Sequence, residues 1–144
     1  MKTMRIWAFC LAAALSLAAF GSVAEAGITA RIDLSAQKMR VYSNGKLAYT
    51  WTVSTARSGY RTPTGTYRPQ RMHKMWYSRK YDMSPMPHSI FFRGGYAIHG
   101  TNAVKNLGRP ASHGCVRLHP SNARTLYNLV KQSGPSNTRI IITR

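Results

Sequence analysis

Acidic residues are almost absent from this chain of 144 residues, which has 21 Lys and Arg but only three Asp and Glu. The three acids are Glu25, Asp33 and Asp82. A glycosidase usually needs two carboxylates that flank the scissile bond, and a zinc peptidase usually needs a Glu as base or ligand. The scarcity of carboxylates therefore disfavours both classes and leaves His and Cys as the groups expected to transfer protons.

The N-terminal segment has no apolar run long enough for a comfortable membrane span. Two basic residues precede a short apolar run over residues 6–20, and Ala24-Glu25-Ala26 follows as a small-x-small cleavage site. This layout predicts a signal peptide over residues 1–26 and one domain over residues 27–144. We expect export to the periplasm or cell wall without stable membrane insertion after cleavage, with an uncleaved anchor as the alternative.

Cysteine is as scarce as acid, since Cys10 and Cys115 are the only two. Cleavage would remove Cys10, so the exported domain would hold one cysteine and no internal disulfide. A lone cysteine in a secreted protein indicates a reactive thiol or intermolecular pairing. The alternative is a buried, inert cysteine that packs as a small apolar side chain.

Basic residues are the feature in excess, because cleavage would leave 19 of them against two acids. Such a balance indicates an anionic partner. Expected export argues against nucleic acid, so the candidate partners are anionic envelope polymers. The alternative is that the charges only keep the surface soluble.

The apolar pattern predicts a mainly β domain with one helix near the C-terminus, a sandwich or barrel without βαβ units. Asn44-Gly45 is a strong hairpin signal between two of the strands. Residues 71–89 show no clean period and are expected to form a long surface loop, whose aromatic residues serve as a lid or as core. The strands are expected at 28–35, 38–42, 47–54, 66–68, on both sides of a glycine turn within 90–100, at 115–118 and at 138–144, and the helix is expected to start at an N-cap Ser121 or Asn122 and to end before Gly134.

Cys115 lies in the stretch SHGCVRLH, residues 112–119, beside imidazole and guanidinium groups. If the stretch is extended, His113, Cys115 and Arg117 share one face while the alternate residues enter the core. Arg117 and a protonated His113 would favour a thiolate. Gly114 would let a ligand approach the backbone, and nearby N–H groups would hold an oxyanion.

Metal binding is the rival interpretation of the same stretch. His113, Cys115 and His119 would be the ligands, but their spacing fits no zinc pattern. We therefore expect no metal site.

The order His99-Gly100 followed by Ser112-His113-Gly114-Cys115 resembles the active-site signature of the L,D-transpeptidases of the YkuD type, exported bacterial enzymes that cross-link peptidoglycan. Residues 61–67, RTPTGTY, resemble a second segment of that family, and the resemblance covers residues 27–144. It implies a β-sandwich of mixed sheets with one helix near the C-terminus. Two departures are Arg117, where many members have Asn, and a short loop between Gly100 and Ser112.

The resemblance implies acyl transfer from a peptidoglycan stem tetrapeptide through a thioester, with no metal or organic cofactor. The roles it implies are Cys115 as nucleophile, His99 as base, His113 and Ser112 as orienting residues, Gly114 and Cys115 as oxyanion donors through their amides, and Arg117 and Gly100 as substrate-binding residues. The sequence leaves open a carboxypeptidase or wall-amide hydrolase with the same fold, and a non-enzymatic cationic wall-binding protein.

Overall fold

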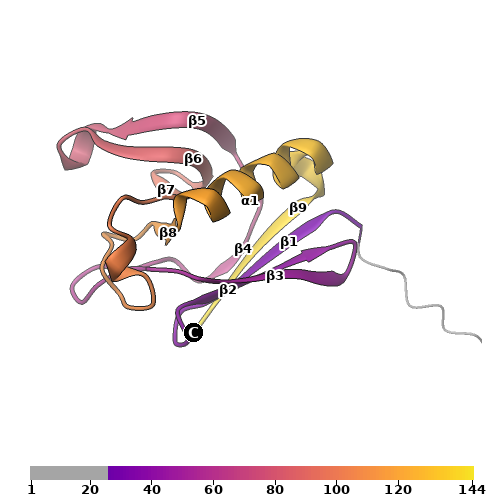
Figure 1. Cartoon of the computed structure of the whole chain (residues 1–144), viewed down its shortest axis with the longest axis horizontal. Coiled ribbons are helices and arrows are strands. Elements are labelled where there is room, and N and C mark those ends of the chain that lie inside the picture. Colours follow the sequence, from indigo (N-terminus) through magenta and orange to yellow (C-terminus); the bar gives the residue numbers. More distant parts are fainter. Residues whose placement is uncertain (1–25) are drawn as a thin grey trace, which may run out of the picture.

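The computed structural model describes residues 26–144 and contains two mixed β-sheets and one α-helix (Figure 1). The predicted leader therefore lies outside the described residues, apart from its last position. In the first sheet the strand order is β3-β2-β1-β9-β4, and all neighbours are antiparallel except β1 and β9. Its strands are β1 (Ile28–Asp33), β2 (Lys38–Ser43), β3 (Lys46–Thr52), β4 (Gly65–Tyr67) and β9 (Thr138–Thr143).

The second sheet has the order β5-β6-β7-β8, in which β7 and β8 run parallel. Its strands are β5 (Arg71–Ser78), β6 (Ser84–Arg93), β7 (Tyr96–Gly100) and β8 (Val116–Leu118). The mainly β class with mixed sheets is thus confirmed. Short 3-10 turns cover Arg79–Tyr81, Val104–Asn106 and Pro135–Asn137.

One apolar core joins both sheets and the helix α1 (Pro120–Ser133). In β1 the buried Ile28, Ala30 and Ile32 alternate with more polar positions, as the period of a strand requires. The helix packs against β6 and β7 and buries Ala123, Leu126 and Val130. Within residues 26–144 no helix is long and apolar enough to cross a membrane.

The predicted turns and helix end are confirmed. Asn44 and Gly45 both have positive φ, 49° and 79°, as a two-residue hairpin between β2 and β3 requires. The helix ends at Gly134 as expected, but its N-cap is two residues before Ser121 and three before Asn122, the two predicted N-caps. His119 is the N-cap, because its side chain accepts the amide of Ser121 and Pro120 has a φ already suited to the first helical position.

Residues 71–89 are not the predicted loop, because β5 and β6 form a hairpin there. In β5 the exposed Lys74 lies between Met72 and Trp76 on the same face, so the sequence lacks a simple apolar alternation. Met72 packs on the main core, while Trp76 packs on a second cluster formed by Met86, Phe91 and Ala97. The core interpretation is thus confirmed for Met72 and Trp76, and the role as a lid stays a prediction.

A segment that follows β3 connects the two sheets at one end of the molecule. Ser54 bridges to Arg117 and Ala56 bridges to Ser112. The backbone of Ser54 both donates to and accepts from that of Arg117, at 3.0 and 2.8 Å. The end of β3 therefore fixes the position of the turn that leads into β8.

Candidate active site

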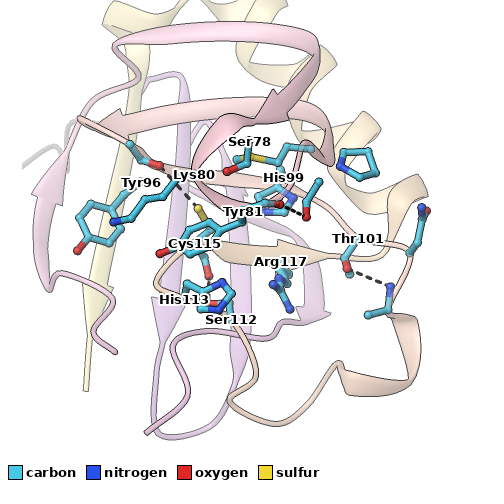
Figure 2. Close-up of a pocket in the computed structure, with 16 residues that line it drawn as sticks. Ser78, Lys80, Tyr81, Tyr96, His99, Thr101, Ser112, His113, Cys115 and Arg117 are labelled. Atoms are coloured by element: carbon cyan, nitrogen blue, oxygen red, sulfur yellow. Dashed lines mark hydrogen bonds between the residues drawn. The ribbon is translucent and has the colours of Figure 1, made fainter. Parts of the chain in front are cut away.

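A cavity of about 460 Å³ lies over the end of the second sheet where β7 and β8 meet the β5–β6 hairpin tip (Figure 2). Five of the residues predicted from the sequence line it: His99, Ser112, His113, Cys115 and Arg117. His99 comes from β7, and the other four come from the turn before β8 and from β8 itself. The fold thus brings the distant His99 to the SHGC turn.

The turn before β8 is held by two hydroxyl groups. The hydroxyl of Ser112 donates to the carbonyl of Cys115 at 2.7 Å and accepts the amide of Gly114 at 3.0 Å. The hydroxyl of Thr62 donates to the carbonyl of Gly114 at 2.8 Å and accepts the amide of Ala56 at 3.1 Å. Since both hydroxyls are buried, these bonds are protected from water and fix the backbone on either side of the thiol.

Gly114 has a φ of 135°, which side chains with a Cβ rarely adopt. A Cβ at this position would lie 2.5 Å from Cε1 of Tyr96 and 2.9 Å from the carbonyl oxygen of Arg61. Its amide already donates to Ser112 and is not free for an oxyanion. Of the two amides suggested by the sequence, only that of Cys115 remains a candidate donor.

The predicted alternation around Cys115 is present. His113, Cys115 and Arg117 are partly exposed and line the cavity, while Val116 and Leu118 are fully buried in the main core. Cys115 rests on the second apolar cluster with Phe91 and Ala97. Its Sγ lies 3.8 Å from the carbonyl oxygen of Gly95.

His99 is almost fully buried, with 6% of its surface exposed. Burial lowers its pKa to about 4, and Arg117 lowers it too, although the bond to Gly100 opposes the shift. Its Nδ1 lies 2.6 Å from the carbonyl oxygen of Gly100, which can only accept, so Nδ1 carries the proton. The imidazole is therefore neutral at pH 7, and Nε2 has a free lone pair.

The thiol differs from the thiolate expected from the sequence. Burial raises the pKa of Cys115, and the Ala97 amide and the Arg117 guanidinium lower it by less. Arg117 acts in the predicted direction, but the apolar cluster beneath the sulfur outweighs it. The resting site is accordingly a neutral thiol beside a neutral imidazole.

His113 forms part of the wall between the hairpin tip and a turn near residue 60. Its ring stacks on Tyr81, with centroids 4.0 Å apart and planes at 10°, and meets Tyr60 edge-on at 4.7 Å. Burial lowers its pKa first, followed by the charges of Arg57, Arg117 and Lys80. These contacts orient the imidazole and join the tip of the β5–β6 hairpin to the turn before β8, here called the catalytic turn.

Arg117 is half-buried beside the thiol with few partners of its own. Its Nη1 donates to the carbonyl of Ala111 at a long 3.4 Å. Burial lowers its pKa, as does Arg57, while Cys115 raises it. A guanidinium in this state has free donors for a carboxylate.

Two residues singled out by the sequence lie outside the cavity. Gly100, predicted to bind substrate, packs under the helix, where a Cβ would lie 3.1 Å from Pro87 and 3.3 Å from Pro120, and it does not line the cavity. His119 caps the helix and contacts the Ser121 hydroxyl at 2.8 Å. In the described part of the chain, His, Cys, Asp and Glu side chains form no group of three that could hold a metal ion.

Four other residues shape the site without a clear signal in the sequence. Thr62 holds the turn, and its only signal was the TPTG segment, which is weak alone. Tyr96 packs against Gly114, and Lys80 and Tyr81 line the cavity from the hairpin tip. No local pattern could show that residues 78–86 fold over Cys115.

A cysteine that shares a cavity with a buried neutral histidine, on a backbone turn fixed by hydrogen bonds, is suited to acyl transfer. The site thus defines the class of protein, and the similarity to known proteins gives its family. Residues 28–142 match the model of the family described as YkuD, L,D-transpeptidase catalytic domain. The chain belongs to this family.

Individual relatives agree with this assignment. The YkuD protein of Bacillus licheniformis is 26% identical over 119 residues, which cover 78% of this chain but only 63% of that protein. A crystal structure of an L,D-transpeptidase from Stackebrandtia nassauensis has a TM-score of 0.72 and 27% identity, with 89% of this chain and 62% of that one covered. L,D-transpeptidase 3 of Mycobacterium tuberculosis, solved with a faropenem-derived adduct, shares the fold with a TM-score of 0.69 and 18% identity, over 82% of this chain and 60% of that one. The chain therefore spans about three fifths of the length of these relatives.

We predict that Gly114→Ala destabilises the protein by about 1–3 kcal/mol and abolishes activity, because the new methyl group meets Tyr96 and a backbone oxygen. Gly134→Ala is the matched control, since Gly134 also has positive φ but its nearest neighbour would lie 3.9 Å away. It should lose some stability and keep its activity. Urea unfolding and labelling of Cys115 would test both variants, and a fully active Gly114→Ala would contradict the role of the turn.

We also predict that His99 makes stability depend on pH. Its pKa is about 4 when folded and about 6.5 when unfolded, so between these values only the unfolded chain binds the proton. The free energy of unfolding should therefore fall as pH falls from 6.5 to 4, by on the order of 3 kcal/mol. His88 and His113 act in the same direction. The His99→Gln variant isolates the contribution of His99, and parallel unfolding curves for the two proteins would refute it.

Proposed function

We propose that the domain is an exported transpeptidase of the periplasm or cell wall that forms peptidoglycan cross-links. The observation that carries the proposal is the meeting of Cys115 and the neutral His99 in one cavity, on a turn that two buried hydroxyls hold in place. The family assignment supplies the chemistry of the reaction, acyl transfer between peptides. Export rests on the leader-like sequence of residues 1–26.

In the first step the Sγ of Cys115 attacks the carbonyl carbon of the third residue of a donor stem tetrapeptide. Because thiol and imidazole both rest neutral, the Nε2 of His99 takes the thiol proton as the C–S bond forms. The developing oxyanion is placed near the amide of Cys115, the free donor of the turn. His99 then gives the proton to the leaving amine, so D-Ala departs and a thioester remains.

In the second step the side-chain amine of another stem attacks the thioester. His99 removes a proton from that amine, and the thiol leaves with it as the new amide bond forms. The same site would run as a carboxypeptidase if water replaced the amine. The second apolar cluster shields the sulfur from water on one side only. Whether an amine or water attacks the thioester therefore depends on which of them occupies the opposite side, toward the cavity.

Cys115→Ala should abolish turnover and covalent labelling while it leaves the fold intact. Intact-mass analysis with faropenem, the β-lactam named for the solved relative, should show one adduct on the wild type and none on the variant. Circular dichroism of both proteins controls for folding. Retained labelling or turnover in the variant would remove the basis of the proposal.

Product masses from disaccharide tetrapeptide identify the reaction itself. A cross-linked dimer supports the transpeptidase, and a tripeptide without dimer supports the carboxypeptidase. Binding to wall material with neither product would favour a cationic wall-binding protein. The Cys115→Ala protein is the blank for each product.

The basic surface should hold the enzyme on anionic wall material. The reason for this expectation is that residues 27–144 contain 19 basic residues and only two acidic ones. Since the Debye length falls from about 10 Å at 0.1 M salt to about 3 Å at 1 M, binding to sacculi should fall steeply with salt. Turnover of a small soluble stem peptide should fall less in the same titration. Sacculus binding that stays flat would show that specific contacts hold the enzyme there.

A further inference from the structure

The cavity is lined by two cationic side chains that no reaction step uses directly, Lys80 and Arg117, and by no acid. The only acids of the described residues are Asp33, which is bonded to Ser35 and Ala36, and Asp82, which does not line the cavity. A positive cavity without internal counter-charge is suited to a ligand that carries negative charge. Because Lys80 and Arg117 are separate, we expect the ligand to carry its negative charge at two separate positions.

Arg117 lies opposite His99 in the register of β7 and β8, and both residues line the cavity. On the proposed function, the guanidinium is therefore on the side of the base that protonates the leaving amine. In an amino acid the carboxylate is one carbon away from that amine. Arg117 is thus suited to the terminal carboxylate of the donor.

Lys80 lies on the other side of Cys115 in Figure 2, where its side chain extends toward Tyr96. It belongs to the 3-10 turn at the hairpin tip, and its Nζ is 5.5 Å from the ring of Tyr81. The stacking of Tyr81 on His113 ties this tip to the catalytic turn. Lys80 is exposed and lines the cavity, so its ammonium can reach an anion bound there.

We propose that Lys80 is a specificity-determining residue that binds a free carboxylate on the acyl residue of the donor, the residue that becomes the thioester. The enzyme would then prefer a donor with this carboxylate over one in which it is a neutral amide. The assignment rests on the proposed function for the position of the scissile bond. It goes beyond that function because it selects among donors.

The test uses two synthetic tetrapeptide donors that differ only in a carboxylate or a primary amide on the side chain of the third residue. For the wild type we expect a lower KM with the carboxylate donor. Lys80→Met should raise that KM about five- to tenfold and leave the KM of the amide donor and both kcat values nearly unchanged. Lys80→Arg should keep the preference, because it keeps the charge.

Arg79→Met is the matched control, since Arg79 is in the same turn and carries the same charge but does not line the cavity. It should leave the preference intact. Equal KM values for the two donors in the wild type, an unchanged preference in Lys80→Met, or an equal loss in Arg79→Met would each overturn the proposal.

The two proposals fail in distinguishable ways. Release of D-Ala from both donors without preference would refute the role of Lys80 and leave the transpeptidase proposal standing. Release from neither donor would refute the proposed function. Calorimetric binding of both peptides to Cys115→Ala, with and without Lys80→Met, then still decides whether Lys80 recognises the carboxylate.

Discussion

The hydrogen bonds around Gly114 are the constraint on which the rest of the site depends. Ser112 binds both sides of the turn through one hydroxyl, and Thr62 holds the carbonyl of Gly114 from a segment 52 residues away. The backbone can pass this point only because Gly114 has no Cβ to meet Tyr96. The next residue is then delivered to the cavity, and the one after it to the main core. The backbone geometry of this turn thus places the thiol in the cavity.

A further property of the site is that no carboxylate lines its cavity. In many cysteine and serine enzymes an acid orients the histidine, but here the carbonyl of Gly100 does so. A carbonyl fixes the tautomer without adding charge, and burial then keeps His99 neutral. A nearby acid would favour the imidazolium, and Arg117 opposes it. A very basic protein can therefore keep a neutral imidazole at the centre of its site.

Local signals predicted those parts of the molecule that are determined locally. The Asn44-Gly45 turn, the alternation of β1 and the helix that ends at Gly134 depend on residues close together in the sequence, and the structure confirms them. The β5–β6 hairpin could not be predicted in this way, because the exposed Lys74 lies between Met72 and Trp76 and interrupts the apolar alternation of β5. The neutral state of the thiol could not be predicted from the sequence either, since the groups that desolvate Cys115 come from β6 and β7. Spacing identified His99 as a residue of the site, but only the fold shows that its neighbour Gly100 orients it.

Charge acts at two ranges in this protein, and the ranges have different consequences. The many exposed basic residues act over about a Debye length, so they attract any polyanion and discriminate little. Inside the cavity, Lys80 and Arg117 are separated by the thiol and lie near partly apolar walls, where an ion–dipole or ion–ion contact is less screened. A donor is then selected by the spacing of its charges, whatever its total charge. The hairpin tip that supplies Lys80 is joined to the nucleophile by the stacking of Tyr81 on His113, so recognition of the donor and the geometry of attack depend on the same contact.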